Sequence, residues 1–240
     1  MPVQRPDFFE GGVYHIYNRG VAKLPTFLQE EDYVDFQDIM RYLLIGFPKS
    51  KQKDAILPKE WPVTYKADPI SNGLFLRYID LCAYCLMPNH FHLMMQLKVP
   101  EGKIQKIDGR IASFHTIPEF IRRLCITYSH KFNHRHNREG ALFQGRFKVK
   151  HVPGDLDVLQ VVRYIHLNPV VSNLVRHPGE WVYSDYCHYV GLDPSSQNRI
   201  TQRNLVLSYF DSKTDRYRDF VEAPIAEREG KILAKYMMDI

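Results

Sequence analysis

Two histidines, His90 and His92, stand one residue apart in the segment PNHFHLMMQL. Successive side chains of a β-strand point to opposite faces, so a strand here places both imidazoles on one face. Phe91 and Leu93 then point to the other face, where we expect them to pack against helices. Two imidazoles on the exposed face of a central strand can ligate one divalent cation without a rearrangement of the chain. The alternative interpretation is a pair of incidental surface histidines.

A tyrosine and an asparagine, Tyr164 and Asn168, lie four residues apart in the segment LDVLQVVRYIHLNP. On a helix this spacing puts both side chains on the same face. An amide oxygen can then bind the cation with a phenol beside it. The alternative is a tyrosine that packs between helix and sheet and an asparagine that closes the helix before Pro169. His166 is expected to face away from Tyr164, as a surface or packing residue.

Basic residues gather between positions 121 and 150. This segment holds eight lysines and arginines and one acid, Glu139, so its net charge is +7, whereas the whole chain has +5. Such a concentration is typical of a phosphate-binding surface, and the alternative is a solvated helix face. Arg146 and Lys148, at alternating strand positions, are the strongest candidates for phosphate contacts. Arg19, which follows the first expected strand, is a further candidate. The full set of candidate phosphate contacts is Arg19, Arg122, Arg123, Lys131, Arg135, Arg138, Arg146, Lys148 and Lys150.

The elements that must position these residues follow from the apolar pattern. Strands are expected over residues 12–18, 74–86, 90–97 and 142–151, and helices over 26–44, from Thr116 onward, and from Asp155 or Asp157 to about Asn168. Pro169 disfavours a longer third helix. The order β, α, β, β, α, β, α predicts an α+β sandwich, with a central antiparallel sheet and helices packed on one face.

Two parts of the chain depart from this pattern. Residues 46–71 contain four prolines and several lysines, and we interpret them as a surface insertion. After about residue 193 the density of elements falls, and a short helix is expected near 202–210. We therefore predict a catalytic domain over 1–192 and a helical C-terminal appendage over 193–240.

The amino-acid composition restricts only the broad structural class of the protein. The chain has 240 residues, of which 45% are hydrophobic and 25% charged, so a globular core is expected and general disorder is not. Cys82 and Cys85 form one C-x-x-C without a second pair, which favours free core thiols over a zinc site. No apolar run reaches the ~18 residues that span a bilayer, so we expect no membrane association and a cytoplasmic location.

Four sequence segments follow one another along the chain: GVYHIYNRG, AYCLMPNHFHLMM, GALFQGRFK and RYIHLNPV. A fifth segment, WVYSDYCHYVG, comes after them. Together they resemble the HUH single-tyrosine transposases, most closely the REP-associated branch, over roughly residues 11–191. The resemblance implies a ferredoxin-like sandwich with the histidine strand at its centre. It makes His90 and His92 metal ligands and Tyr164 the nucleophile. Asn168 becomes the third ligand, where insertion-sequence relatives usually have glutamine.

The resemblance further implies a metal-dependent endonuclease and strand-transferase that acts on single-stranded or hairpin DNA. Tyr164 would form a 5′-phosphotyrosine and release a 3′-hydroxyl, with Mg²⁺ or Mn²⁺ as the cofactor. Two other functions stay open: a nucleic-acid-binding protein that has lost catalysis, and a hydrolytic metal nuclease in which Tyr164 only packs. The sequence does not decide between a monomer and a homodimer.

Overall fold

The computed structural model describes residues 6–46, 75–98, 116–193, 200–224, 230–231 and 234–236. Apart from Gly46, the predicted insertion at 46–71 lies outside these residues. The strands are β1 (Val13–Arg19), β2 (Ile79–Met87), β3 (His90–Leu97) and β4 (Lys148–His151). The helices are α1 (Glu30–Ile45), α2 (Thr116–Arg135), α3 (Asp155–Val171), α4 (Tyr186–Tyr189), α5 (Asn204–Leu207) and α6 (Thr214–Glu222). Single 3-10 turns are η1 (Val21–Lys23), η4 (Phe75–Arg77), η5 (Pro178–Glu180) and η7 (Ser208–Phe210).

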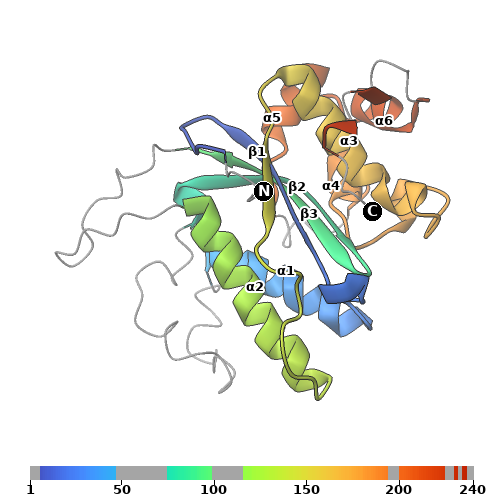
Figure 1. The fold of residues 1–240 in the computed structure, drawn as a ribbon. Helices are drawn as coiled ribbons and strands as arrows, with labels where there is room; N and C mark the ends of the chain where they lie inside the picture. The colour runs from blue at the N-terminus through green and yellow to red at the C-terminus, as the bar shows by residue number, and fades with distance from the viewer. Residues whose placement is uncertain are drawn as a thin grey trace.

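The described strands form one antiparallel sheet in the order β2-β3-β1-β4 (Figure 1). The chain order β1-α1-β2-β3-α2-β4 combined with this strand order is that of a ferredoxin-like sandwich. The predicted α+β class with a central antiparallel sheet is confirmed. Because β3 lies between β2 and β1, the strand that carries the two histidines is held on both edges, and β4 is an edge strand.

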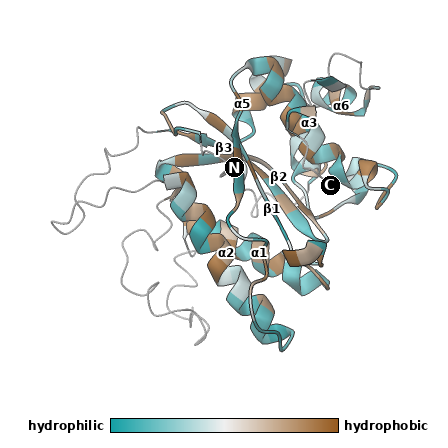
Figure 2. Cartoon of the chain, in the orientation of Figure 1, coloured by the Kyte–Doolittle hydropathy of each residue, from teal (hydrophilic) through white to brown (hydrophobic). Residues whose placement is uncertain are grey.

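The face of the sheet toward α1 and α2 is the larger apolar core. Phe91, Leu93 and Met95 of β3 are fully buried there, with Tyr14 and Ile16 of β1. This is the face that the period-two pattern assigns to helix packing, and the prediction is confirmed for these two helices. In Figure 2 brown apolar residues alternate with teal polar residues along α2.

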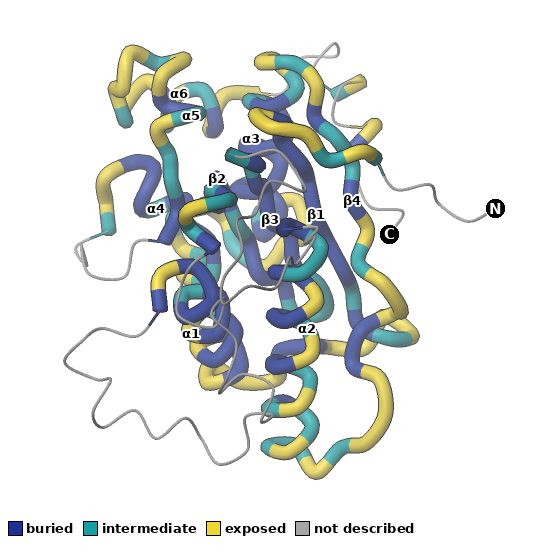
Figure 3. The backbone as a smooth tube through the Cα atoms, turned by 90° about the vertical axis from the view of Figure 1, so that its left-hand side faces the viewer, coloured by how far each residue is buried: buried dark blue, intermediate teal, exposed yellow. Residues whose placement is uncertain are grey.

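The opposite face is covered as well, by α3. Val161, Val162 and Ile165 pack there against Ala83 of β2 and Met94 of β3, in a second core. The expectation that the histidine face is exposed is therefore wrong. Residues 160–166 of α3 are all buried, so this part of the helix is covered on every side rather than along one stripe. Figure 3 shows β1, β3 and α3 in the dark blue of buried residues.

Several boundaries differ from those predicted, for local reasons. α1 begins at Glu30 rather than near residue 26, because Asp32 accepts hydrogen bonds from the backbone N–H groups of Leu28 and Gln29. β4 begins only at Lys148, since Gly145 has a φ of 68° that a strand does not adopt. α3 continues through Pro169 to Val171 instead of ending at Asn168.

The segment after residue 193 packs onto α3. Val206, Tyr217 and Val221 join the second core. His166 of α3 is fully buried and its ring is held at both nitrogens, 3.0 Å from Asp185 Oδ1 and 2.7 Å from the Tyr217 hydroxyl. His166 is thus a packing residue. The division of the chain at 192/193 stays a prediction.

The four cysteines are free, and Cys82 and Cys85 are buried, as the core-thiol interpretation requires. Within the part of the chain that the structure describes, no helix combines the length and the apolarity that a membrane span needs.

Candidate functional site

His90 and His92 share the face of β3 that α3 covers, so the shared face predicted from their spacing is confirmed. Their ring centroids are 4.9 Å apart and their planes are perpendicular. His92 is fully buried, whereas His90 is partly exposed at the end of the strand. The two rings therefore lie at the boundary between the second core and the solvent.

Tyr164 and Asn168 reach these rings from α3. The ring centroid of Tyr164 is 5.3 Å from that of His92, in an edge-to-face arrangement. The side chain of Asn168 lies next to the His90 ring and opposes the lowering of the His90 pKa by burial. Tyr164 and Asn168 are 6% and 5% exposed, so both are nearly enclosed. The packing of α3 across β2 and β3 thus brings together the four side chains that the sequence singled out.

A third histidine completes the cluster and was not predicted. His15 of β1 is fully buried, and its Nε2 lies 2.9 Å from Nδ1 of His92. The two rings stack with centroids 5.1 Å apart and planes 18° apart. Tyr17, two residues on, lies on the same face with its ring centroid 6.0 Å from that of His92. The alternation in GVYHIYN places His15 and Tyr17 together, but only the pairing of β1 with β3 brings them to His92.

Burial keeps the three imidazoles neutral at physiological pH. It lowers the pKa of His15 to about 3, with help from the charge of Lys150. It lowers the pKa of His90 to about 4, and Arg19 adds to the effect. The pKa of His92 falls well below its ordinary value, through burial first and then the neighbouring His90 and His15. A neutral ring keeps one nitrogen lone pair, which is the form that binds metal ions.

The atoms at the meeting point of these side chains suit a cation. Nδ1 of His90 is 2.7 Å from the Asn89 amide oxygen, so this nitrogen carries the proton and Nε2 keeps its lone pair. Nε2 of His92 is buried and has no hydrogen-bond partner among the described residues. In the Asn168 amide, the oxygen is the atom that can bind a cation. No group of three or more His, Cys, Asp or Glu side chains in these residues could hold a metal. The donor set is therefore two imidazoles and one amide, which leaves coordination positions open.

Three of the predicted phosphate contacts flank this cluster. In the strand register, Arg19 of β1 lies opposite His90 of β3, and Lys148 of β4 lies opposite Tyr17 of β1. The Nζ atoms of Lys148 and Lys150 lie 5.9 and 5.8 Å from the Tyr17 ring centroid. These cations stand on the histidine side of the sheet and give it positive charge.

The basic residues of α2 lie on the other side of the sheet and have acidic partners. Arg135 bonds to Asp32 at 2.7 Å and also pairs with Asp35, and Lys131 pairs with Asp35. Arg122 and Arg123 pair with Glu119. The charge count along residues 121–150 did not include these acids, because two of them come from α1. Arg138 is bonded to Asn133 and to a backbone carbonyl.

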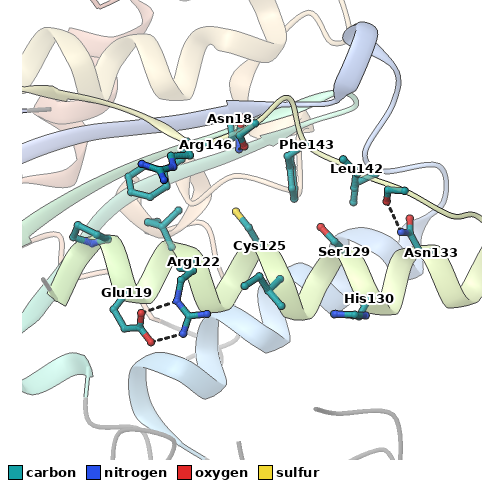
Figure 4. A pocket seen from close by; sticks show the side chains of 17 residues that line it. Asn18, Glu119, Arg122, Cys125, Ser129, His130, Asn133, Leu142, Phe143 and Arg146 are labelled. Atoms are coloured by element: carbon teal, nitrogen blue, oxygen red, sulfur yellow. Dashed lines mark hydrogen bonds and ion pairs between the residues drawn. The ribbon is translucent and has the colours of Figure 1, made fainter. Parts of the chain in front are cut away.

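Arg146 borders a groove of about 750 Å³ between α2 and residues 140–147 (Figure 4). Phe143 and Phe147 contribute aromatic surface to it, and Asn18 lies at the sheet end. Figure 4 shows Arg146 and Phe143 facing α2 from the opposite wall. The groove opens on the α2 side of the sheet, but β4 is the edge strand. A ligand that passes over this edge can therefore contact both the groove and Lys148.

The chain was compared with known proteins. No family model matches it. It is 34% identical over 110 residues to a protein of Haemophilus influenzae (strain ATCC 51907 / DSM 11121 / KW20 / Rd) named "Putative REP-associated tyrosine transposase". The alignment covers 45% of this chain and 58% of that relative.

A solved structure gives the fold-level comparison. It is described as "Structure of the REP associates tyrosine transposase bound to a REP hairpin", and it matches 85% of this chain and 98% of its own with a TM-score of 0.50. The identity of 17% makes this a likeness of fold. The resemblance seen in the sequence strings is confirmed: this chain is similar to the REP-associated tyrosine transposases, in sequence over part of its length and in fold over most of it.

Proposed function

We propose that this chain is a metal-dependent endonuclease and strand-transferase that cuts and rejoins single-stranded or hairpin DNA through Tyr164. The observation that carries the proposal is the convergence of His90, His92 and Asn168 beside the Tyr164 ring. The names of the two relatives support it, since one is a tyrosine transposase by name and the other is described as bound to a REP hairpin.

His90, His92 and Asn168 would hold Mg²⁺ or Mn²⁺. A bound cation neutralises charge on the phosphate and orients it for attack. Burial supports this role of the protein, because it keeps the imidazoles unprotonated and so ready to act as ligands. The cytoplasm is the proposed place of action.

In the proposed reaction the Tyr164 oxygen loses its proton and attacks the phosphorus of one DNA linkage. A bond forms between this oxygen and phosphorus while the bond from phosphorus to O3′ breaks, and O3′ takes up a proton. The products are a 5′-phosphotyrosine and a free 3′-hydroxyl. Attack by a 3′-hydroxyl on the phosphotyrosine reverses the step. Rejoining needs no external energy source, since one phosphodiester is exchanged for another.

The DNA backbone is proposed to lie along Arg19, Lys148 and Lys150. Arg146 would contact a neighbouring phosphate across the β4 edge. Unpaired bases would enter the groove beside Phe143 and Phe147, where flat apolar surface favours stacking.

The test is incubation of the protein with a labelled hairpin oligonucleotide and Mn²⁺. We expect a denaturant-resistant protein–DNA adduct that Tyr164→Phe abolishes. Tyr183→Phe is the matched control, because Tyr183 stacks on Tyr33, outside the histidine cluster, and this variant should keep the adduct. Cleavage without an adduct would support the hydrolytic nuclease instead. Binding without cleavage would support the DNA-binding protein that has lost catalysis.

A further inference from the structure

Among the groups assigned to the reaction, His15 makes its hydrogen bond to His92, and its ring also lies edge-on to that of Tyr164, with 6.2 Å between the centroids. The register pairs Tyr17 with His92 and His15 with Met94, so His15 is the diagonal neighbour of His92 on the same face. The contact is a hydrogen bond of 2.9 Å between His15 Nε2 and His92 Nδ1, and both rings are fully buried. In a hydrogen bond between two imidazoles, one of the two facing nitrogens must carry the proton and the other must keep its lone pair.

Each neutral imidazole carries one N–H, so this contact has two arrangements. In the first, His92 Nδ1–H donates to His15 Nε2, and the lone pair of His92 is on Nε2. In the second, His15 Nε2–H donates to His92 Nδ1, and Nε2 of His92 carries a proton. Only the first arrangement lets His92 act as a ligand through Nε2.

The two ring nitrogens outside this hydrogen bond, one on each histidine, make the two arrangements comparable in energy. His15 Nδ1 and His92 Nε2 are both buried, and neither has a hydrogen-bond partner in the described parts of the chain. In either arrangement one of them is an unsatisfied N–H donor and the other an unsatisfied lone pair. Hydrogen bonding within the protein therefore does not fix the proton position, whereas a cation at His92 Nε2 selects the first arrangement.

We propose that His15 is a positioning residue, which accepts the Nδ1 proton of His92 and so directs the Nε2 lone pair of His92 toward the cation. This inference rests on the proposed function. A histidine ligand generally donates its second N–H to a carboxylate, a carbonyl or water, which fixes its tautomer and its orientation. Here a neutral imidazole takes that place. Unlike a carboxylate, it adds no negative charge, so the positive charge of the cation stays available to the phosphate.

The test compares His15→Phe with His15→Gln. Phenylalanine keeps a flat ring but offers no acceptor, whereas glutamine offers an amide oxygen. We expect His15→Phe to weaken Mn²⁺ binding by ~10- to 100-fold, the usual effect of losing such a partner, and His15→Gln to retain most of the affinity. The Mn²⁺ dissociation constant is measured without DNA, from the electron paramagnetic resonance signal of the free ion. A folded His15→Phe protein that binds Mn²⁺ as tightly as the unchanged chain would overturn the inference.

A second measurement does not depend on the folding of a variant. Nitrogen-15 NMR of the histidine rings in the unchanged protein with saturating Mg²⁺ reports the tautomer of His92. We expect a proton on Nδ1, and a proton on Nε2 would refute the inference. His92→Ala separates the two proposals: if it leaves Mn²⁺ affinity unchanged, the proposed metal site itself is wrong. If it weakens Mn²⁺ binding but His15→Phe does not, only the role of His15 is wrong.

Discussion

Lys148 lies on the histidine side of the sheet, whereas the basic residues of α2 lie on the other side. This difference predicts how Lys148→Ala changes the salt dependence of hairpin binding. Lys148 is exposed on the histidine side, near Tyr17. Each phosphate contact contributes ~0.7–0.9 to the slope of log affinity against log salt concentration. Loss of this one contact should lower the slope by about that amount. One phosphate contact multiplies the hairpin affinity by a factor that varies as the salt concentration to the power of about −0.8. Loss of the contact should therefore lower the affinity roughly sixfold at ~0.1 M salt and hardly at all near ~1 M.

The matched control is Lys131→Ala, which removes the same charge from α2. Lys131 pairs with Asp35 of α1, and its side chain is about one-third exposed. We expect the salt slope for hairpin binding to stay the same and the free energy of unfolding to fall by up to ~1 kcal/mol, as for a partly exposed ion pair. Fluorescence anisotropy of a labelled hairpin across a salt series measures the slopes, and urea denaturation measures the stability. Equal loss of slope in both variants, or loss only in Lys131→Ala, would refute the division between the two sides of the sheet.

Three further predictions follow from the same contacts. His90→Ala and His92→Ala should each abolish hairpin cleavage while binding persists, and cleavage retained at saturating Mn²⁺ would remove that residue from the ligand set. Arg146→Ala should weaken hairpin binding and flatten its salt dependence, and an unchanged slope would exclude the contact. Burial alone would raise the pKa of Asp32, but hydrogen bonds from the Leu28 backbone, His136 and Arg135 hold that pKa below its usual value. Such a group stabilises the fold above the unfolded pKa, near ~4, and this stability is lost as pH falls through the folded pKa. Asp32→Asn should therefore lower the free energy of unfolding by roughly 3 kcal/mol at pH ~7, and urea denaturation at low pH should show this difference shrinking. A difference that does not change with pH would contradict the role given to Asp32.

Local periodicity was enough to predict part of the site. A spacing of two on a strand places His90 and His92 on one face, and a spacing of four on a helix does the same for Tyr164 and Asn168. Both relations depend only on the geometry of a single element, and the structure preserves both. The order of the elements predicted the α+β sandwich with one antiparallel sheet for a related reason, because few topologies connect such elements by short links. The ferredoxin-like arrangement was implied by the family resemblance.

The features that the sequence did not predict depend on contacts between distant segments. His15 meets His92 only through the register of β1 against β3, which no local pattern specifies. Arg135 of α2 is neutralised by Asp32 of α1, and a charge count along one segment cannot include a partner so far away in the chain. The burial of His92 follows from α3 lying across the sheet, which is again a matter of packing between elements.

The most direct test of the whole account is the position of Mn²⁺ in crystals of the protein, located by its anomalous scattering. We predict one strong peak in contact with His90, His92 and the Asn168 amide, with the Tyr164 hydroxyl beside it. A peak bound elsewhere, or no peak at this cluster at saturating Mn²⁺, would contradict the claim that these side chains form a metal site for tyrosine chemistry.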